Sequence, residues 1–140
     1  MAVIARFLID TSAAARMPNP IVRARLEPLI KGGVVGTCAT LDAEALYSAR
    51  SLAGYEQIRA DRLIAYEHLP IDDEHWTLAF QAQHRLARSG RHRAVGIEDL
   101  LTAVVAAEHR LSIVHYDADF DVAAEVIDFD QQWVAERGTL

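Results

Sequence analysis

The chain has 140 residues, enough for one domain with a full hydrophobic core, and it carries a net charge of −6 at pH 7. Its 51% apolar and 24% charged residues exclude a disordered chain, and no apolar run approaches the ~20 residues of a membrane span. The apolar start of the chain has no basic region in front of it, so we expect a strand there and not a signal peptide. The single cysteine, Cys38, excludes an internal disulfide, fits a reducing cytoplasm, and is expected to be a small buried residue.

Short apolar segments separated by helical patterns predict a mostly parallel sheet. The segment 2–9 is apolar almost throughout, as expected of a strand that is buried on both faces. We expect strands at 2–9, 34–37, 112–115 and 126–129, and either a short strand or an extended linker at 68–71. Because helices lie between these segments, the sequence predicts a single α/β domain over residues 1–140. The tail, residues 131–140, is expected to be loosely attached.

Apolar residues at helical spacing predict a series of helices between these strands. The helices are expected at residues 13–17, 20–31, 41–52, 55–66, 72–89 and 97–110, with a further helical turn at 122–125. Thr11 or Ser12 is expected to cap the first helix and Thr40 the third, Pro28 should kink or split the second, and Gly54 should break the chain before the fourth. The residues expected to face inward are Ile21, Leu26, Leu29 and Ile30, then Leu41, Ala45, Ser48 and Leu52, then Ile58, Leu63 and Ile64.

Carboxylates occur where several of these elements begin or end. Asp10 ends the first strand, and Asp117 and Asp119 follow a later one. In an open α/β sheet, ligands bind beyond the carboxyl ends of the strands, so we expect these acids at such an edge. Asp99 is a carboxylate in the first turn of a helix that is apolar around most of its circumference and expected to be buried, and Glu44 flanks the apolar face of its own helix.

Each of these acids also has a purely structural interpretation. Asp10 is a candidate helix cap, Asp99 suits the dipole of its helix, Glu44 can be solvated, and Asp117 and Asp119 can hold a turn. Brought together, however, the five like charges repel one another unless a cation lies among them. A hard divalent ion, Mg²⁺ or Mn²⁺, prefers oxygen ligands, and it can activate water and neutralise charge on a phosphodiester. As a set, the acids predict a metal site.

The segments around these acids resemble those of a known family. They are Phe7-Leu-Ile-Asp10-Thr-Ser12, Thr40-Leu-Asp-Ala-Glu44-Ala-Leu46, Ile97-Glu-Asp99-Leu-Leu-Thr-Ala-Val-Val-Ala106 and Ile113-Val-His-Tyr-Asp117-Ala-Asp119-Phe120. In this order and at these intervals the chain resembles PIN-domain proteins over almost its whole length. Within that family it is similar to the VapC toxins of bacterial VapBC toxin–antitoxin pairs. The resemblance implies a three-layer α/β/α fold with a short, mostly parallel sheet surrounded by helices.

The resemblance also implies a function, a Mg²⁺-dependent endoribonuclease that is toxic to its host when free, with Mn²⁺ as the alternative ion. The residues that match the acidic quartet of the family are Asp10, Glu44, Asp99 and Asp117, and Asp119 matches a further acid of many members. Which of Asp117 and Asp119 contacts the metal stays open, and Thr11 or Ser12 would orient a carboxylate or a water. The implied reaction is in-line attack of metal-activated water on an RNA phosphate, without a covalent intermediate.

The partners that the resemblance implies are RNA, a cognate VapB antitoxin and a second copy of the chain. The antitoxin would lay an apolar and basic segment across the acidic cleft and neutralise the enzyme. A homodimer and a toxin–antitoxin hetero-oligomer are expected only because the resembling family forms such assemblies. The helices at 20–31 and 54–66 are candidates for contact with the antitoxin or with the second subunit.

Basic and aromatic residues outside the acidic set allow more than one interpretation. Four arginines crowd the end of the helix at 72–89 and the loop after it: Arg85, Arg88, Arg91 and Arg93. They would contact RNA phosphates, although the negative net charge argues against nucleic acid, or they form a solvated helix end that suits the helix dipole. His115 is expected to be packed or exposed at a sheet edge rather than catalytic. Trp76 and Trp133 are expected to anchor packing rather than to stack on bases.

Two other function classes compete with the ribonuclease interpretation. Phosphoryl transfer to a strand-end Asp, as in receiver domains or haloacid-dehalogenase-like phosphatases, needs a lysine near the phosphate. Lys31, the only lysine, lies at a helix end beside two glycines, and Ser12 stands where the dehalogenase pattern has its second Asp. The other competitor is a catalytically inert PIN-like binding or scaffold module. Such degenerate domains lose acids from the quartet, whereas this chain has an acid at every matching position.

Overall fold

The fold is built on one sheet of parallel strands. In the computed structural model, which describes residues 2–140, the strand order is β3-β2-β1-β4-β5. The strands are β1 (Phe7–Ile9), β2 (Val35–Thr37), β3 (Glu67–His68), β4 (Ser112–His115) and β5 (Asp130–Trp133). Every neighbouring pair is parallel, so the predicted α/β class with a parallel sheet is confirmed.

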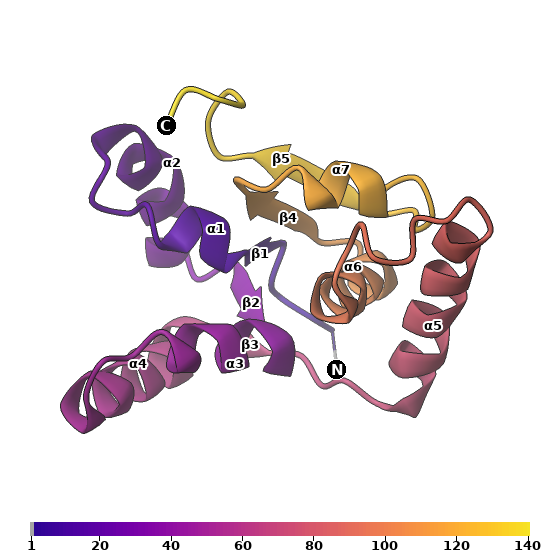
Figure 1. The fold of residues 1–140 in the computed structure, drawn as a ribbon. Coiled ribbons are helices and arrows are strands. Elements are labelled where there is room, and N and C mark those ends of the chain that lie inside the picture. The colour runs from indigo at the N-terminus through magenta and orange to yellow at the C-terminus, as the bar shows by residue number, and fades with distance from the viewer. Residues whose placement is uncertain (1) are drawn as a thin grey trace.

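Helices connect the strands and cover both faces of the sheet. They are α1 (Thr11–Ala14), α2 (Pro20–Lys31), α3 (Ala39–Tyr47), α4 (Leu52–Ala65), α5 (Asp73–Ala87), α6 (Ile97–His109) and α7 (Asp119–Ala123). Figure 1 shows β1 and β4 near the centre, α6 and α5 to the right of them, and α4 reaching away from the sheet at the lower left. Among the described residues, no helix is both long enough and apolar enough to cross a lipid bilayer.

The two faces of the sheet bury different parts of the core. Leu8 and Ile113 are partners in the ladder between β1 and β4, and both pack on the side of α6. Ile9 and Val114, the next pair along the same strands, pack on the opposite side with α2. This alternation follows from the two-residue repeat of a strand. Helix α6 is the central helix of the core, and its buried run from residue 100 to residue 106 confirms the predicted burial.

The first strand is shorter than predicted. The N–H groups of Ile4 and Ala5 donate to Glu67 Oε1 at 3.0 and 2.7 Å, so a glutamate side chain takes the place of a neighbouring strand. Ile4 is 72% exposed. The prediction of a strand over 2–9, buried on both faces, was therefore wrong for its first half, and β1 begins only at Phe7.

The last strand lies at Asp130–Trp133 and not at 126–129 as predicted. It pairs with β4 along its whole length, from Ser112 opposite Asp130 to His115 opposite Trp133. The apolar residues of 126–129 pack instead against the core after α7. Val134, which follows β5, is 4% exposed. The start of the segment 131–140 is therefore part of the sheet and is not loosely attached.

Helix α2 is continuous although Pro28 lies inside it. Proline removes one backbone donor near the end of this helix, and the following turn still closes, since Gly32 N donates to Pro28 O at 2.9 Å. Of the two effects predicted for Pro28, the split was wrong, and the kink stays a prediction. Val22 and Leu26 are its buried residues, whereas Ile21, which was expected to face inward, is 62% exposed.

Helix α3 begins earlier and ends earlier than predicted. Cys38 occupies the N-cap position and is buried, as expected for this residue, whereas Thr40 is not the cap and lies inside the helix. The Thr40 hydroxyl instead hydrogen-bonds Thr102 Oγ1 of α6 at 2.7 Å. Because the helix ends at residue 47, Ser48 and Leu52 are exposed and do not share its buried face.

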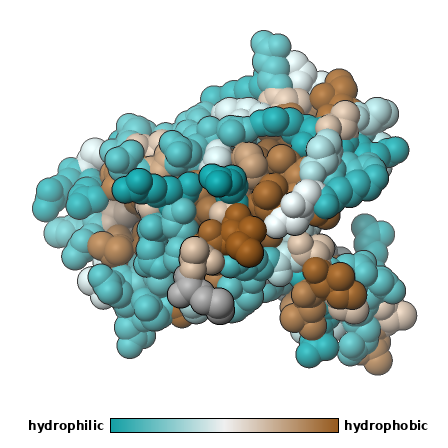
Figure 2. Space-filling model, turned by 180° about the vertical axis from the view of Figure 1, so that it is seen from behind, coloured by the Kyte–Doolittle hydropathy of each residue, from teal (hydrophilic) through white to brown (hydrophobic). Residues whose placement is uncertain are grey.

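Helix α4 includes Gly54 and has an uncovered apolar surface. Ser51 caps the helix by accepting a hydrogen bond from Gly54 N at 3.0 Å, so the predicted break at Gly54 was wrong. None of the helix residues is buried, and Leu63 and Ile64, which were expected inside, are 70% and 87% exposed. Figure 2, which shows the molecule from behind, has this hydrophobic surface at the lower right.

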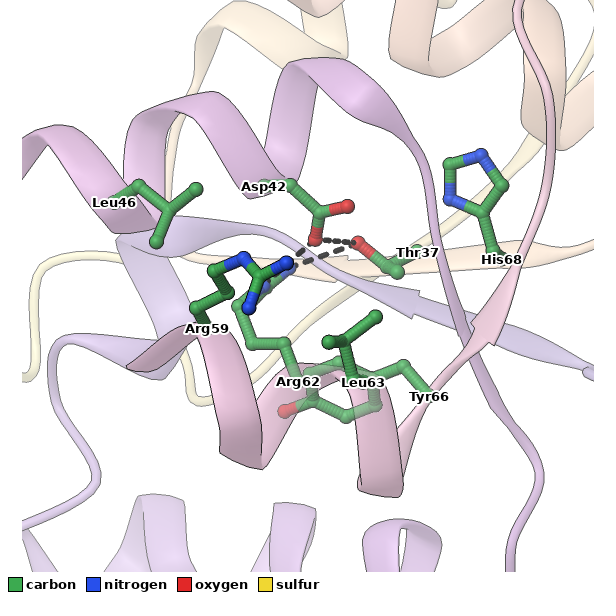
Figure 3. A pocket seen from close by; sticks show the side chains of 8 residues that line it. All are labelled: Thr37, Asp42, Leu46, Arg59, Arg62, Leu63, Tyr66 and His68. Atoms are coloured by element: carbon green, nitrogen blue, oxygen red, sulfur yellow. Dashed lines mark hydrogen bonds and ion pairs between the residues drawn. The ribbon is translucent and has the colours of Figure 1, made fainter. Parts of the chain in front are cut away.

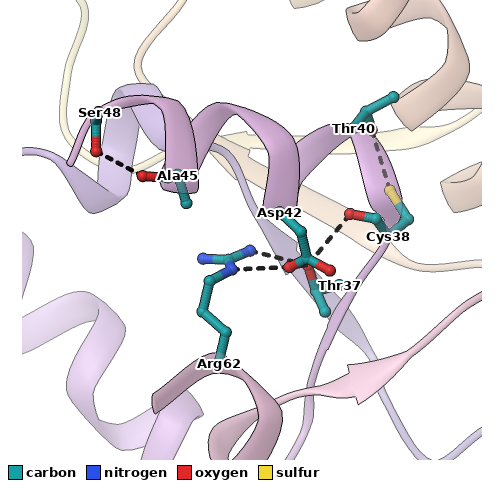
Figure 4. A network of polar contacts seen from close by, with 7 residues as sticks. All are labelled: Thr37, Cys38, Thr40, Asp42, Ala45, Ser48 and Arg62. Atoms are coloured by element: carbon teal, nitrogen blue, oxygen red, sulfur yellow. Dashed lines mark hydrogen bonds and ion pairs between the residues drawn. The ribbon is translucent and has the colours of Figure 1, made fainter. Parts of the chain in front are cut away.

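A polar network attaches α4 to the body of the protein. Arg62 donates from Nε to Asp42 Oδ1 and from Nη2 to Thr37 Oγ1, both at 2.8 Å, and the Thr37 hydroxyl donates to the same Asp42 oxygen at 2.8 Å (Figure 4). The guanidinium also lies 5.0 Å from the centre of the Tyr66 ring. The Arg62 side chain is only 16% exposed. These contacts stand in for the apolar packing that α4 lacks.

Candidate active site

Asp10 follows β1 directly and caps helix α1. Its Oδ2 accepts hydrogen bonds from Ser12 N at 3.0 Å and from Ser12 Oγ at 2.6 Å. Because helical geometry already begins at Thr11, the cap is Asp10 and not Thr11 or Ser12 as predicted. The residue is 3% exposed, and its Oδ1 is buried without a hydrogen-bond partner among residues 2–140. A buried carboxylate oxygen without a donor is available as a ligand atom.

The ends of β1 and β4 are joined by hydrogen bonds that also place Asp117 and Asp119. Ser12 Oγ accepts from Tyr116 N at 2.9 Å, which connects the segments that follow the two neighbouring strands. His115 Nδ1 accepts from Asp117 N at 3.1 Å, and Asp117 Oδ1 accepts from Asp119 N at 2.9 Å. The sequence indicated both acids, but no pattern in it marks His115 as the residue that orients the Asp117 backbone.

Glu44 comes to the same place from α3. Its Oε2 accepts a hydrogen bond from Thr11 Oγ1 at 2.6 Å. One turn before Glu44 on α3, Thr40 bonds Thr102, which lies one turn after Asp99 on α6. Since the Thr102 hydroxyl already donates to a backbone carbonyl of its own helix at 2.9 Å, Thr40 is the donor of this pair. The hydrogen bond therefore holds α3 and α6 together close to Glu44 and Asp99.

The five carboxylates share one electrostatic environment. One carboxylate oxygen each of Asp99, Asp117 and Asp119 lies within 4.8 Å of the others. The pKa of Asp99 is raised from 3.8 to about 8, first because burial removes water from its charged form, and then because the Asp10, Glu44, Asp117 and Asp119 carboxylates repel that form. Burial and the Asp117 carboxylate also raise the pKa of Asp119. The structure thus brings all five predicted acids together.

The acidic cluster fits a divalent cation. Within residues 2–140, the ion pairs of the chain involve other acids, namely Glu27, Asp42, Asp72, Glu108 and Glu125, so no arginine, lysine or histidine neutralises the cluster. Burial and the neighbouring carboxylates therefore raise the pKa of Asp99 without a cation to oppose them. Hard ions such as Mg²⁺ and Mn²⁺ take oxygen ligands, and the cluster offers carboxylate oxygens alone. The donor set and the unpartnered oxygen of Asp10 therefore suit a metal site.

The predicted arginine tract lies apart from the cluster, against the end of α7. Arg85 Nη1 donates to the backbone carbonyl of residue 126 at 2.9 Å, and Arg91 pairs with Glu125 at 3.1 Å. Arg88 and Arg93 are exposed. Because α7 begins at the cluster and the arginines contact the segment after its other end, the structure does not place them among the five acids.

The aromatic residues separate into packed and exposed ones. His115 is fully buried, with its ring centre 4.8 Å from that of Phe120 and 5.0 Å from that of Trp133, which confirms the predicted packing. Burial lowers the pKa of His115. Trp76, in contrast, is 41% exposed and touches Phe80 with 5.8 Å between ring centres. The prediction that Trp76 anchors packing is therefore confirmed only in part.

Two hollows flank α3, and only one of them reaches the acids. A cavity of about 260 Å³ between α3 and α4 is lined by Asp42, Arg59, Arg62 and neighbouring residues (Figure 3). Asp42 already pairs with Arg62. Because Glu44 follows Asp42 by two residues in the helix, the two side chains lie on different faces of α3. A groove of about 750 Å³ on the other side of α3 is lined in part by Glu44. Glu44 is therefore the acid that connects the cluster with this groove.

Comparison with known proteins identifies a protein family that matches most of the chain. Residues 7–126 match the PIN domain family. Ribonuclease VapC21 of Mycobacterium tuberculosis is 39% identical over 134 residues, which cover 96% of this chain and 97% of the relative. Ribonuclease VapC51 of the same organism is 38% identical over 136 residues, covering 96% and 97%.

Solved structures share the fold. The VapBC2 structure from Rickettsia felis, bound to a DNA fragment from its promoter, superposes with a TM-score of 0.70 at 16% identity, covering 91% of this chain and 98% of the other. The VapBC-5 structure from Mycobacterium tuberculosis, described as a member of the VapBC family of toxin–antitoxin systems, has a TM-score of 0.61 at 25% identity and covers 91% and 97%. The three-layer α/β/α arrangement expected from the sequence is confirmed by these likenesses.

Proposed function

Because this chain belongs to the PIN-domain family, and within it to the VapC ribonucleases, we propose that it is a Mg²⁺-dependent endoribonuclease that hydrolyses phosphodiester bonds of cellular RNA. In this proposal residues 1–140 act as one PIN domain in the cytoplasm, and Mn²⁺ is the alternative ion. The observation that supports the proposal most is the convergence of five carboxylates from four separate segments, with the charge of Asp99 left uncompensated.

The proposed metal ligands are Asp10, Glu44, Asp99, Asp117 and Asp119. A divalent cation bound there supplies a Lewis acid that activates water and offsets the charge of a phosphate. The hydroxyls of Thr11 and Ser12 hold Glu44 and Asp10 in fixed orientations. His115 positions the Asp117 backbone and transfers no proton, because its Nδ1 accepts from Asp117 N and its Nε2 hydrogen-bonds Gln131.

Two further surfaces are assigned to partners in this proposal. Arg88 and Arg93 are exposed beside the contacts of Arg85 and Arg91, and together the four arginines would meet RNA phosphates away from the cluster. The uncovered apolar face of α4 would contact a VapB-type antitoxin or a second copy of the chain, in a homodimer or in a toxin–antitoxin hetero-oligomer. The complexes of the VapBC structures support such a partner by fold likeness.

The test is cleavage of total RNA by the purified protein with Mg²⁺, with Mn²⁺ and with a chelator. Asp99→Asn is the main variant, because it removes a cluster charge without touching the cap that Asp10 provides. Asp128→Asn, an exposed acid outside the cluster, is the matched control. We expect discrete, metal-dependent fragments from the wild type and the control, and none from Asp99→Asn.

A catalytically inert PIN-like binding or scaffold module is the competing function. It predicts that the folded wild-type protein cleaves no RNA with either metal. Isothermal titration with Mg²⁺ adds a readout that is independent of turnover. Metal binding without cleavage would favour the inert module, whereas the absence of both would refute the metal site itself.

A further inference from the structure

The groove beside the acidic cluster has the features of a site for a single nucleobase. It has a volume of about 750 Å³ and lies between α3, the start of α5 and the start of α6. The residues of its lining that matter here are Glu44, Tyr47, Trp76, Ile97 and Glu98. Glu44 belongs to both the groove and the cluster, and Glu98 is adjacent to Asp99 in sequence. An RNA strand with one phosphate at the cluster would therefore place its neighbouring nucleotide at the groove.

Trp76 is a rigid, accessible aromatic face in this groove. Its side chain is 41% exposed although a packed helix holds its backbone. Asp72 and His75 form a reciprocal cap directly before it, and His75 itself is 3% exposed. Phe80, one turn further on, supports the ring at 5.8 Å. Base–aromatic stacking on such a face is a common means of holding unpaired RNA.

The charges of the groove admit a base and disfavour a phosphate. In the part of the chain that the structure describes, its lining contains no arginine or lysine, and its charged groups are the carboxylates of Glu44 and Glu98. Glu98 is exposed in the first turn of α6. Gly96 leaves room for this carboxylate, since a Cβ at position 96 would lie 2.9 Å from Glu98 Oε2. Glu98 and Trp76 thus line the same groove, one with an exposed carboxylate and the other with an aromatic ring.

From these features we propose that the groove binds a guanine base of single-stranded RNA next to the scissile phosphate, stacked on Trp76 and recognised by Glu98. This inference rests on the proposed ribonuclease function, because the phosphate at the cluster brings the base to the groove. Guanine presents two adjacent donors, N1–H and N2–H, which a carboxylate accepts as a pair. Adenine, cytosine and uracil each place an acceptor beside the donor, and that acceptor would face the negative charge.

Binding to two uridine oligomers tests the base site without any need for cleavage. One oligomer carries a central guanosine, and the other carries inosine, which lacks the N2 donor. We expect the guanosine oligomer to quench the tryptophan fluorescence of the wild type and to bind roughly fivefold to a hundredfold more tightly than the inosine oligomer. Trp76→Ala should abolish the quenching and weaken binding by a similar factor, whereas Leu78→Ala, an exposed residue of α5 outside the groove lining, should keep both the quenching and the preference.

Glu98→Gln separates the carboxylate from the aromatic face. It should bind both oligomers equally, because the amide offers one acceptor in place of two, and Glu56→Gln on α4 is the control of equal charge change. Equal binding of both oligomers by the wild type, or a preference that survives Glu98→Gln, would overturn the proposal. No response of Trp76 to either oligomer would also overturn it and would leave a peptide segment of a partner as the occupant. Failure of the ribonuclease function itself would appear separately, as no cleavage of total RNA.

Discussion

The uncompensated charge of the acidic cluster gives Asp99→Asn a definite effect on stability. In the metal-free protein the pKa of Asp99 is about 8, against 3.8 for an ordinary aspartate. Between these two values the folded protein keeps a proton that the unfolded chain has lost, so the free energy of unfolding decreases as the pH rises. The slope is about 1.4 kcal/mol per pH unit, which amounts to about 3 kcal/mol between pH 5 and pH 7. Asparagine does not titrate, and Asp99→Asn should remove this contribution.

Urea unfolding at pH 5, 6, 7 and 8 in the presence of a chelator measures the effect directly. The decline in stability should be steeper for the wild type and for Asp128→Asn than for Asp99→Asn, and Asp99→Asn should be at least as stable as the wild type at pH 7. Added Mg²⁺ should stabilise the wild type more at pH 8 than at pH 5, because the ion binds the ionised carboxylates, and it should stabilise Asp99→Asn much less. Equal slopes for Asp99→Asn and the wild type would refute the argument, and a clear loss of stability in Asp99→Asn would make Asp99 a structural residue.

Three further substitutions test the hydrogen bonds around the cluster and the attachment of α4. Ser12→Ala leaves Tyr116 N without its acceptor and should lower the free energy of unfolding in urea by roughly 1–3 kcal/mol, whereas an unchanged value would mean that the bond between the strand ends is weak. Thr11→Val frees Glu44 and should lower the Mg²⁺ affinity in calorimetry roughly tenfold or more, and equal affinity would remove Thr11 from the metal site. Arg62→Met should speed hydrogen exchange of the α4 amides relative to Arg59→Met, an exposed neighbour on the same helix, and equal exchange in the two variants would refute the anchoring role.

The acidic site was accessible from the sequence because each acid is tied to a recognisable local event. Asp10 and Asp117 follow apolar strands, and Asp99 lies in the first turn of a buried, mostly apolar helix. Parallel strands release such residues at one edge, so element order alone brings them near one another. The hydrogen bond between Thr40 and Thr102 was not accessible, since it depends on how two helices pack and not on the pattern of either.

The errors concern segments whose partner decides their structure. Asp130–Trp133 is polar and has no strand pattern of its own, but β4 supplies the ladder that makes it a strand. Leu63 and Ile64 have the spacing of core residues, yet they are exposed, because helical periodicity says which residues share a face and not what covers that face. Pro28 shows the same limit for local rules, since a proline in a packed helix need not end it.

The central position of β1 in the sheet has a consequence for how the protein is synthesised. The strand β1 is synthesised well before β4, which is one of its two neighbours, so Leu8 has no partner on that side until Ile113 has been added. A nascent chain that stops just before residue 112 contains Asp10, Glu44 and Asp99 but lacks β4 and the last two carboxylates of the cluster. Interrupted translation should therefore release fragments without nuclease activity. In a protein proposed to attack the RNA of its own host, this order of assembly delays any hazard until β4 and the acids after it have been synthesised.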